Sequence, residues 1–537
     1  MRTLVTLSLL LVACDPSMPS TDAGPSDGSL PTDSAFSGDA DPPPPTDAGS
    51  PLDSALPDAG PLGEAEVVAP AGRIQGRRID GVDVFLGIPF GAPTGGEARF
   101  RPPTAAAPFD FLEAVDPGPG CPRIPRGGAL TGDEDCLKLH VWRAPDAEDR
   151  PVMVFLHGGA FVNGSGSESL YDGTVLAEKG VVLVSLNYRI GLLGFLASDE
   201  LLAEGGGDTV GNYGLRDQLL ALQWIQDNIA AFGGDPDNVT VFGESAGGVS
   251  ICALLAVPSA EGLFHQAIME SAPDCGFPTP AEAAVTSDAW IAEVGCDTAA
   301  SPLECMRLAS AGALVDAANA VTGGLMGGPR VRPVADGRFL MARTPETPAG
   351  LDVPLLVGSN AEESRIFALR SGVTSLDAYR AHLTQQFGDA AGAVFELYPA
   401  TGNSMSVSAA LRALWTDVAF RCVAFDTALS HHADGSPTYV FEFLGTRSAD
   451  HGAELPYVFG NFERGAPSAA DQALSEALQT VWIDFATTGR ADAHVPRFDP
   501  PSTTLDLVLA DPVTTADHAS DLARCEALRG LGVDFGT

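Results

Sequence analysis

Lysine is almost absent from this chain, since only Lys138 and Lys179 among the 537 residues are lysine. Basic residues number 30 in all against 70 Asp and Glu, which gives a formal net charge of −40 at pH 7. A protein that binds nucleic acid needs a basic face to neutralise phosphates, and an anionic membrane attracts basic patches in the same way. The composition therefore argues against nucleic acid as a partner and against membrane binding through charge.

Two kinds of cofactor motif are also missing from the sequence. No group of cysteines and histidines has zinc-like spacing, and no glycine-rich run resembles a phosphate-binding loop. We therefore expect neither a metal nor an organic cofactor. The chain does have length and apolar content, because 45% of its residues are hydrophobic, and this is enough to build a large buried core.

The N-terminal region has the composition of a targeting segment followed by a tether. Arg2 precedes an apolar run, Leu4–Val12, which is too short to cross a bilayer as a helix. The run leads into Leu-Val-Ala-Cys14, which resembles a bacterial lipobox; the alternative is an ordinary signal peptide with a chance cysteine. The following stretch is rich in Pro, Asp, Ala and Gly and cannot bury enough apolar surface to fold. We expect a signal peptide at 1–13, a disordered tether at 14–64 and a globular domain at 65–537.

Lipidation of Cys14 would anchor an exported protein to a bacterial cell-envelope membrane, on its periplasmic or cell-surface side. Eight cysteines then remain, an even number, as is usual in an exported chain with disulfides. Local spacing favours two pairs that close short loops. The pairing of the other four cysteines stays open, with one option a pair that joins a helix to the next strand and a fourth pair formed by the remaining two. In that order they are Cys121–Cys136, Cys296–Cys305, Cys252–Cys275 and Cys422–Cys525. For any of them the alternative is a buried free thiol.

Beyond the tether, apolar runs of strand length alternate with helical patterns. Leu215–Phe232 has apolar residues at helical spacing and is followed by the stop signals Gly233 and Pro236. Strand runs that are apolar on both faces are typical of a parallel sheet covered by helices, whose ligands bind at the carboxyl ends of the strands. The expected strands are Asp83–Gly87, Leu137–Trp142, Val152–Leu156, Val181–Leu186, Val239–Phe242, Ala267–Glu270, Leu355–Val357 and Thr438–Phe443.

Two glycine-containing motifs follow predicted strands directly. Gly243–Gly247 has the pattern G-x-S-x-G between a strand run and a helix-compatible run, which predicts a tight turn that lifts the Ser245 hydroxyl off the sheet. His157–Phe161, His-Gly-Gly-Ala-Phe, offers backbone N–H groups to a substrate carbonyl. Taken alone, each motif could be a structural glycine turn. Their occurrence together, each after a strand, favours a nucleophilic serine with an oxyanion hole.

Several ordered motifs resemble the carboxylesterase/cholinesterase family (type-B carboxylesterases) of α/β-hydrolases, over about residue 66 to the C-terminus. They are Phe85–Pro89, Glu134–Leu137, His157–Phe161, Asn187–Gly191, Phe232–Pro236 and Phe242–Gly247. The resemblance implies an α/β-hydrolase fold, with a large mostly parallel sheet flanked by helices and with loop and helical insertions around an active-site gorge. It also implies that Ser245 is the nucleophile and that the N–H groups of Gly159, Ala160 and Ala246 form the oxyanion hole. Cys121–Cys136 and Cys296–Cys305 match disulfides usual in the family.

A serine nucleophile needs a histidine base and an acid that fixes the tautomer of that histidine. His451 lies in Asp450–Gly460, which is similar to the family's catalytic histidine loop. For the acid, the family pattern points to Glu363, but Ser364 stands where glycine is usual, so the neighbouring Glu362 stays an alternative. Five other histidines after the serine lie in polar or helical surroundings, where we expect them to be exposed: His382, His431, His432, His494 and His518.

These residues predict a serine carboxylesterase that acts through an acyl-enzyme on a small-molecule ester, as a monomer. Glu244 and Phe161 are expected to contact substrate, although Glu244 could instead orient buried water or the histidine loop. The segment between Cys121 and Cys136 lacks the tryptophan that would hold quaternary ammonium, so choline-ester specificity is not predicted. The alternatives are hydrolysis of an amide, thioester, lactone or carbamate, and a non-catalytic binding protein on the same fold.

Overall fold

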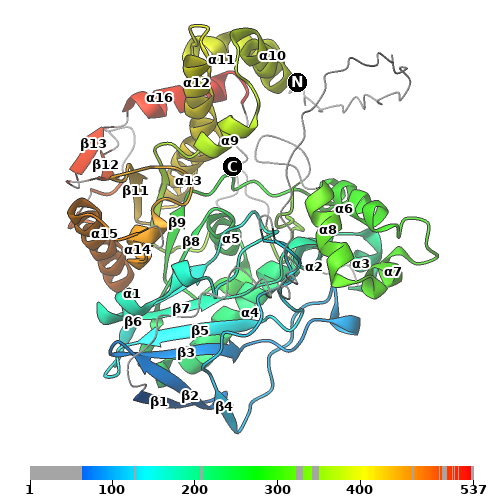
Figure 1. Cartoon of the computed structure of the whole chain (residues 1–537), viewed down its shortest axis with the longest axis vertical. Helices are drawn as coiled ribbons and strands as arrows, with labels where there is room; N and C mark the ends of the chain where they lie inside the picture. Colours follow the sequence, from blue (N-terminus) through cyan, green and yellow to red (C-terminus); the bar gives the residue numbers. More distant parts are fainter. Residues whose placement is uncertain are drawn as a thin grey trace, which may run out of the picture. The chain divides into compact units, whose positions relative to one another are not determined.

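Within the described residues, one thirteen-stranded sheet organises the computed structural model (Figure 1). The strand order is β1-β2-β3-β5-β7-β6-β8-β9-β10-β11-β12-β13, and β4 pairs with β2. The strands are β1 (Gly63–Ala69), β2 (Gly72–Ile79), β3 (Val82–Pro89), β4 (Phe111–Glu113), β5 (Lys138–Arg143), β6 (Arg150–Leu156), β7 (Val182–Leu186), β8 (Gly234–Glu244), β9 (Gln266–Glu270), β10 (Leu355–Asn360), β11 (Thr438–Phe443), β12 (Leu505–Leu509) and β13 (Thr514–Asp517). The structure describes residues 63–533 except 126–127, 206–209, 322–329, 342–349, 463–464, 495, 499–504, 511, 513 and 518.

The helices occupy the connections between these strands. They are α1 (Thr174–Glu178), α2 (Gly191–Phe195), α3 (Asp199–Glu204), α4 (Tyr213–Asn228), α5 (Ala246–Leu255), α6 (Pro280–Val294), α7 (Pro302–Leu308), α8 (Ala311–Val321), α9 (Arg365–Arg370), α10 (Leu376–Phe387), α11 (Ala391–Leu397), α12 (Ser404–Thr416), α13 (Cys422–Ala433), α14 (Leu455–Phe459), α15 (Ala469–Thr488) and α16 (Ala519–Gly530). Short turns are η1 (Gly96–Ala98), η2 (Ser169–Tyr171), η3 (Ile229–Phe232), η4 (Pro258–Ala260), η5 (Gly388–Ala390) and the π-helical η6 (Asp417–Arg421).

The centre of the sheet is parallel, as the apolar strand runs predicted. Parallel pairing runs without interruption from β7 through β6, β8, β9, β10 and β11 to β12. Along β7, β9, β10 and β11 every residue is buried, because helices cover both faces of these strands. The strand order reverses between β6 and β8, and such a switch point opens a crevice at the carboxyl ends of the two strands.

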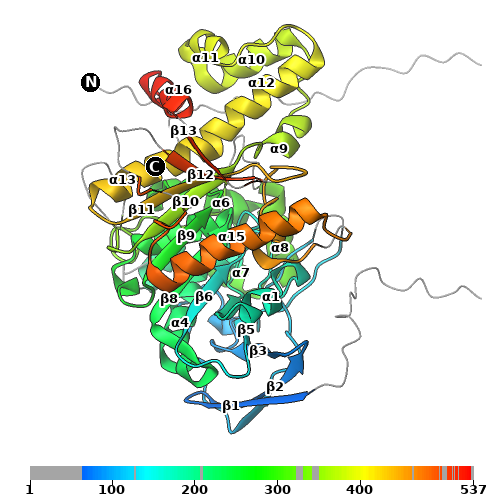
Figure 2. The same cartoon turned by 90° about the vertical axis from the view of Figure 1, so that its left-hand side faces the viewer.

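Two hydrophobic cores pack on the opposite faces of the sheet. Alternate side chains of β6 divide between them: Val152, Val154 and Leu156 join one core, and Met153 and Phe155 the other. The first core includes side chains of α4, α5 and α13, and the second includes those of α1, α14 and α15. Figure 2 shows α15 lying across the strands on the second face. The sheet is therefore covered on both sides, as an α/β-hydrolase fold requires.

All eight strands expected from the sequence are present, with ends that differ by a few residues. β8 begins earlier than expected, at Gly234, so that Pro236 lies inside a strand and not merely beyond a helix. The expected helix divides into α4 and the 3-10 turn η3, and it ends at Gly233 in the left-handed conformation, with φ 76°. The sequence did not predict β1, β2, β4, β12 or β13, which lie toward the two edges of the sheet.

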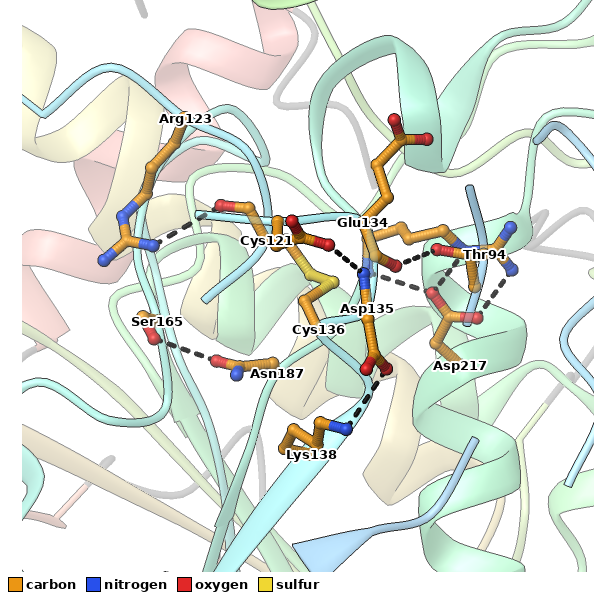
Figure 3. Close-up of a disulfide and its surroundings, with 12 residues drawn as sticks. Thr94, Cys121, Arg123, Glu134, Asp135, Cys136, Lys138, Ser165, Asn187 and Asp217 are labelled. Carbon is orange, nitrogen blue, oxygen red and sulfur yellow. Dashed lines mark hydrogen bonds and ion pairs between the residues drawn. A yellow bond between two sulfur atoms is a disulfide. The ribbon is translucent and has the colours of Figure 1, made fainter. Parts of the chain in front are cut away.

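Four disulfides join eight cysteines. Cys121–Cys136 and Cys296–Cys305 are the pairs that the sequence favoured, and the four cysteines whose pairing stayed open form Cys252–Cys275 and Cys422–Cys525. Figure 3 shows the first pair and its surroundings, where Thr94 Oγ1 donates to the Glu134 carbonyl at 2.6 Å. Cys14 and the expected signal peptide and tether lie outside the described residues, up to the start of β1 at Gly63. In the described part of the chain, no helix has the length and apolar character needed to cross a bilayer.

Candidate active site

Ser245 stands on a tight turn between β8 and α5. Its backbone has φ 55° and ψ −118°, an unfavourable conformation for a residue with a side chain, and its N–H donates to the Glu270 carbonyl at 2.9 Å. A Cβ atom on Gly247 would overlap the Leu156 carbonyl oxygen, so only glycine fits there. The turn thus has the strand–serine–helix geometry that the G-x-S-x-G pattern predicted, and Ser245 is only 9% exposed.

A continuous hydrogen-bonded chain links Ser245 to His451 and Glu363. His451 Nε2 lies 2.9 Å from Ser245 Oγ, and His451 Nδ1 lies 2.7 Å from Glu363 Oε2. Glu363 is fully buried in the loop after β10, where its Oε1 accepts the Asn360 N–H at 2.7 Å. His451 comes from the loop after β11, so three strand ends supply the three side chains. This arrangement can move a proton from the serine hydroxyl to the histidine.

The loop after β6 faces this serine with three consecutive residues in the left-handed region. The φ values are 109° at Gly159, 54° at Ala160 and 58° at Phe161. Within the described part of the chain, the N–H groups of Gly159, Ala160 and Ala246 donate to no protein acceptor. Ala246 is the first residue of α5, where a helix end leaves its N–H groups free and favours negative charge. The structure thus leaves these three donors available to a developing oxyanion.

Buried carboxylates surround the histidine. Glu244 Oε1 lies 3.2 Å from His451 Nε2, and Glu454 accepts a hydrogen bond from the Asn360 amide. Burial lowers the pKa of His451, but Glu244 and Glu363 outweigh it and raise that pKa to about 9. Burial raises the pKa of Glu244 to about 7, and burial together with the Glu244 charge raises the pKa of Glu270 to about 8. The carboxylates beside His451 therefore favour its protonated form.

Two aromatic rings that the sequence did not single out pack on His451. The ring centroids of Phe420 and His451 are 4.9 Å apart, and those of Phe367 and His451 are 5.9 Å apart. Phe420 lies in the π-helical turn η6, and single π-helical turns next to α-helical segments are frequent at functional sites. Glu270, Asn360 and Glu454 were also not singled out. One signal did exist for Glu270, since it ends an expected strand at the edge where ligands bind.

Glu362 and Glu363 point to different surroundings. The Glu362 side chain is 52% exposed and its Oε2 lies 3.8 Å from Arg412, whereas Glu363 reaches His451. The Phe161 ring is buried against Tyr188 and Phe195, at centroid distances of 6.4 and 4.9 Å, so its contact with substrate stays a prediction.

One expectation about the other histidines was wrong. His431 is buried, with a relative exposure of 1%, because its helix α13 packs against the sheet. Its Nε2 lies 2.7 Å from the Val353 carbonyl oxygen. His382, His432 and His494 are partly buried on or beside helices, and His494 Nε2 lies 2.8 Å from Asp484. His518 lies outside the described residues.

Comparison with known proteins gives a consistent result. A family profile described as "Carboxylesterase family" matches residues 63–510. The chain is 38% identical over 465 residues to "Fumonisin B1 esterase" of Sphingopyxis macrogoltabida, which covers 80% of this chain and 84% of the relative. It is also 38% identical over 467 residues to "Para-nitrobenzyl esterase" of Bacillus subtilis (strain 168), which covers 78% of this chain and 88% of that protein. A solved structure titled "PNB esterase" aligns with a TM-score of 0.75 and 34% identity, over 86% of this chain and 99% of that one.

Proposed function

Since the chain belongs to the carboxylesterase family and is a carboxylic ester hydrolase with the α/β-hydrolase fold, we propose that Ser245, His451 and Glu363 carry out its reaction through an acyl-enzyme. The observation that carries the proposal is the unbroken hydrogen-bonded chain from Glu363 Oε2 through the His451 ring to Ser245 Oγ. It lies at the carboxyl ends of β8, β10 and β11, where an open parallel sheet binds its ligands.

Acylation begins when Ser245 Oγ attacks the ester carbonyl carbon and His451 Nε2 takes the hydroxyl proton. The carbonyl oxygen becomes an oxyanion, which the N–H groups of Gly159, Ala160 and Ala246 hold. Glu363 keeps Nδ1 protonated and stabilises the imidazolium that forms. When the tetrahedral intermediate collapses, His451 gives its proton to the leaving alkoxide, and the acyl group stays on Ser245.

Deacylation repeats these steps with water as the nucleophile. His451 takes a proton from a water molecule, whose oxygen attacks the acyl carbon and forms a second oxyanion in the same three-donor site. Collapse of that intermediate returns the proton to Ser245 Oγ and releases the carboxylic acid. The buried surroundings of the triad strengthen each of these electrostatic contacts, because little water screens them.

The names of the relatives describe esterases of quite different small molecules, and the same triad can also cleave amides, thioesters, lactones or carbamates. We favour carboxylic esters because every relative cited above is named an esterase. The experiment is hydrolysis of p-nitrophenyl esters from acetate to palmitate by the whole chain, beside p-nitroanilide and thioester analogues. The ester that is hydrolysed with the highest kcat/KM would show which acyl-chain length the acyl pocket accommodates best. Turnover of the amide or thioester alone would replace this proposal with that activity.

The pH dependence of kcat/KM should report the charge next to the histidine. Catalysis needs neutral His451, so activity should fall as the pH drops below its pKa, which is raised to about 9. Glu244→Gln removes one of the three carboxylates that raise this pKa, so the acid limb of the profile should move to lower pH. The measurement is kcat/KM from pH 5 to 10 for both proteins. An unchanged limb, or one moved to higher pH, would show that Glu244 does not set the charge of His451.

The N-terminal sequence supports a further proposal about location. Leu-Val-Ala-Cys14 after a short apolar run fits a lipid anchor, and the polar stretch that follows fits a tether that holds the enzyme away from the membrane. Expressed in a bacterium, the whole chain should fractionate with membranes, and Cys14→Ser should appear in the soluble exported fraction. The same distribution for both proteins would contradict lipidation of Cys14.

A further inference from the structure

The segment that follows β7, Asn187–Gly191, lies between the two backbone segments that would hold the oxyanion. One of them is the loop that begins at His157, and the other is the start of α5 at Ala246. We propose that Tyr188 is a positioning residue that bridges these two segments and fixes their separation. The inference rests on the proposed function, in which both segments hold the same oxyanion.

The first contact of Tyr188 is with the loop after β6. Its hydroxyl donates to the His157 carbonyl at 2.6 Å, and its ring stacks on the His157 ring with the centroids 4.3 Å apart and the planes 15° apart. Both side chains are almost fully buried. His157 lies two residues before the strained run Gly159–Phe161, so a fixed His157 backbone holds the entrance of that run.

The second contact of Tyr188 is with α5. The Ser250 hydroxyl, whose oxygen lies 2.9 Å from the Ala246 carbonyl oxygen, is a hydrogen-bond partner of the Tyr188 side chain. Because the Tyr188 proton goes to His157, Ser250 is the donor, and its one proton is shared between the Tyr188 hydroxyl oxygen and the Ala246 carbonyl. Gln218 Nε2 donates to the same Ser250 oxygen at 3.0 Å, which holds the hydroxyl in place. A buried polar path therefore runs from the His157 carbonyl through Tyr188 to Ser250 on α5. It joins the loop after β6 to α5, the two elements whose N–H groups would hold the oxyanion.

Tyr188 can hold its neighbours in place because the residues before and after it are themselves fixed by hydrogen bonds and an ion pair. Before it, Asn187 Oδ1 accepts from the Ser165 hydroxyl (Figure 3) and from the Gly166 N–H, each at 2.9 Å. After it, Arg189 makes a buried ion pair with Asp217 of α4, 2.7 Å from Nη2 to Oδ1. Two residues further on, the Gly191 N–H donates to the Phe161 carbonyl at 2.5 Å, at the far end of the strained run.

The strained run has only local hydrogen bonds on its outer side among the described contacts, where the Gly159 carbonyl accepts from the Val162 and Asn163 N–H groups at 3.1 and 3.0 Å. Gly159 and Ala160 are exposed, and three left-handed residues in succession persist only where the surroundings over-determine them. The Tyr188 hydroxyl donates to the carbonyl of His157, two residues before the run, and the Gly191 N–H donates to the carbonyl of Phe161, its last residue. Burial raises the pKa of Tyr188, so the hydroxyl remains a neutral donor at all working pH values.

Tyr188→Phe tests the inference, because it removes the hydroxyl and keeps the ring stack. We expect kcat on p-nitrophenyl butyrate to fall about five- to tenfold, the size of one net hydrogen bond, with KM unchanged within about twofold. Affinity for an alkyl trifluoromethyl ketone, which forms an oxyanion on Ser245, should fall by the same factor. Tyr379→Phe is the matched control, since Tyr379 is also fully buried and donates to a backbone carbonyl, that of Tyr398 at 2.9 Å. It should lose stability but not kcat.

Ser250→Ala removes the hydroxyl at the α5 end of the same path. If the two side chains act as one bridge, Tyr188→Phe/Ser250→Ala should lose no more kcat than the larger single loss, whereas independent effects would multiply. Equal kcat and ketone affinity for Tyr188→Phe and Tyr379→Phe, or multiplied losses in the double variant, would overturn the inference. Absence of turnover by the unaltered chain would instead overturn the proposed function, so the two failures are distinguishable.

Discussion

Replacement of Ser245 by Ala should reduce turnover of p-nitrophenyl esters by about 10⁶-fold, because the triad acts as a unit and loses its nucleophile. The structure should survive, since the Ser245 side chain provides no helix-capping bond and its backbone bonds to Glu270 and Val249 remain possible with alanine. Initial rates with purified proteins, and labelling by a fluorophosphonate probe followed by peptide mapping, measure the effect. The probe should label Ser245 in the unaltered chain and nothing in the variant.

Ser287→Ala is a suitable control for this change. Ser287 is fully buried on α6, and its hydroxyl oxygen accepts the Ala197 N–H at 2.9 Å, outside the triad and the oxyanion loop. It should keep kcat while losing some stability. Equal turnover by Ser245→Ala and the unaltered chain would assign hydrolysis to another residue. The absence of turnover and labelling in both would favour a binding protein on this fold.

The second large effect is expected for Glu363→Gln, about 10⁴-fold in kcat. The amide is almost the same size, but it carries no charge to stabilise the imidazolium and can present an NH₂ group to His451 Nδ1. That group favours the tautomer with its proton on Nε2, which cannot accept the proton of Ser245. The measurement is kcat on p-nitrophenyl butyrate together with the pH profile, whose acid limb should move to lower pH because Glu363 also raises the pKa of His451.

Glu362→Gln is the matched control, since it makes the same chemical change one residue earlier. The Glu362 side chain is half exposed and only 3.8 Å from Arg412 at its nearest, so the variant should keep kcat within about twofold of the unaltered chain. The opposite pattern, a large loss in Glu362→Gln with little in Glu363→Gln, would show that the acid is Glu362. Similar losses in both would indicate that the loop responds to charge as a whole.

Much of the fold could be predicted because the central strands carry their own signal. A strand such as β10 or β11 is apolar along its length, since helices cover both of its faces, and a run of that kind is visible in the sequence. The edge strands β1 and β2 have one exposed face, and their few apolar residues stand between charged residues and glycines, so no continuous apolar run marks them in the sequence. His431 was misjudged for a related reason: its helix is buried by elements distant in the sequence, which its neighbours along the chain do not reveal.

The sequence by itself determined the parts of the site whose geometry is local. The turn at Ser245 and the glycines of the loop after β6 follow from a few adjacent residues, because backbone strain and close approach admit little else there. Only the tertiary structure decided which of Glu362 and Glu363 reaches His451, that Phe420 packs on its ring, and that the Tyr188 hydroxyl donates to the His157 carbonyl. These contacts join side chains from different strand ends, and their distances depend on how the whole sheet twists and packs, which no short stretch of sequence specifies.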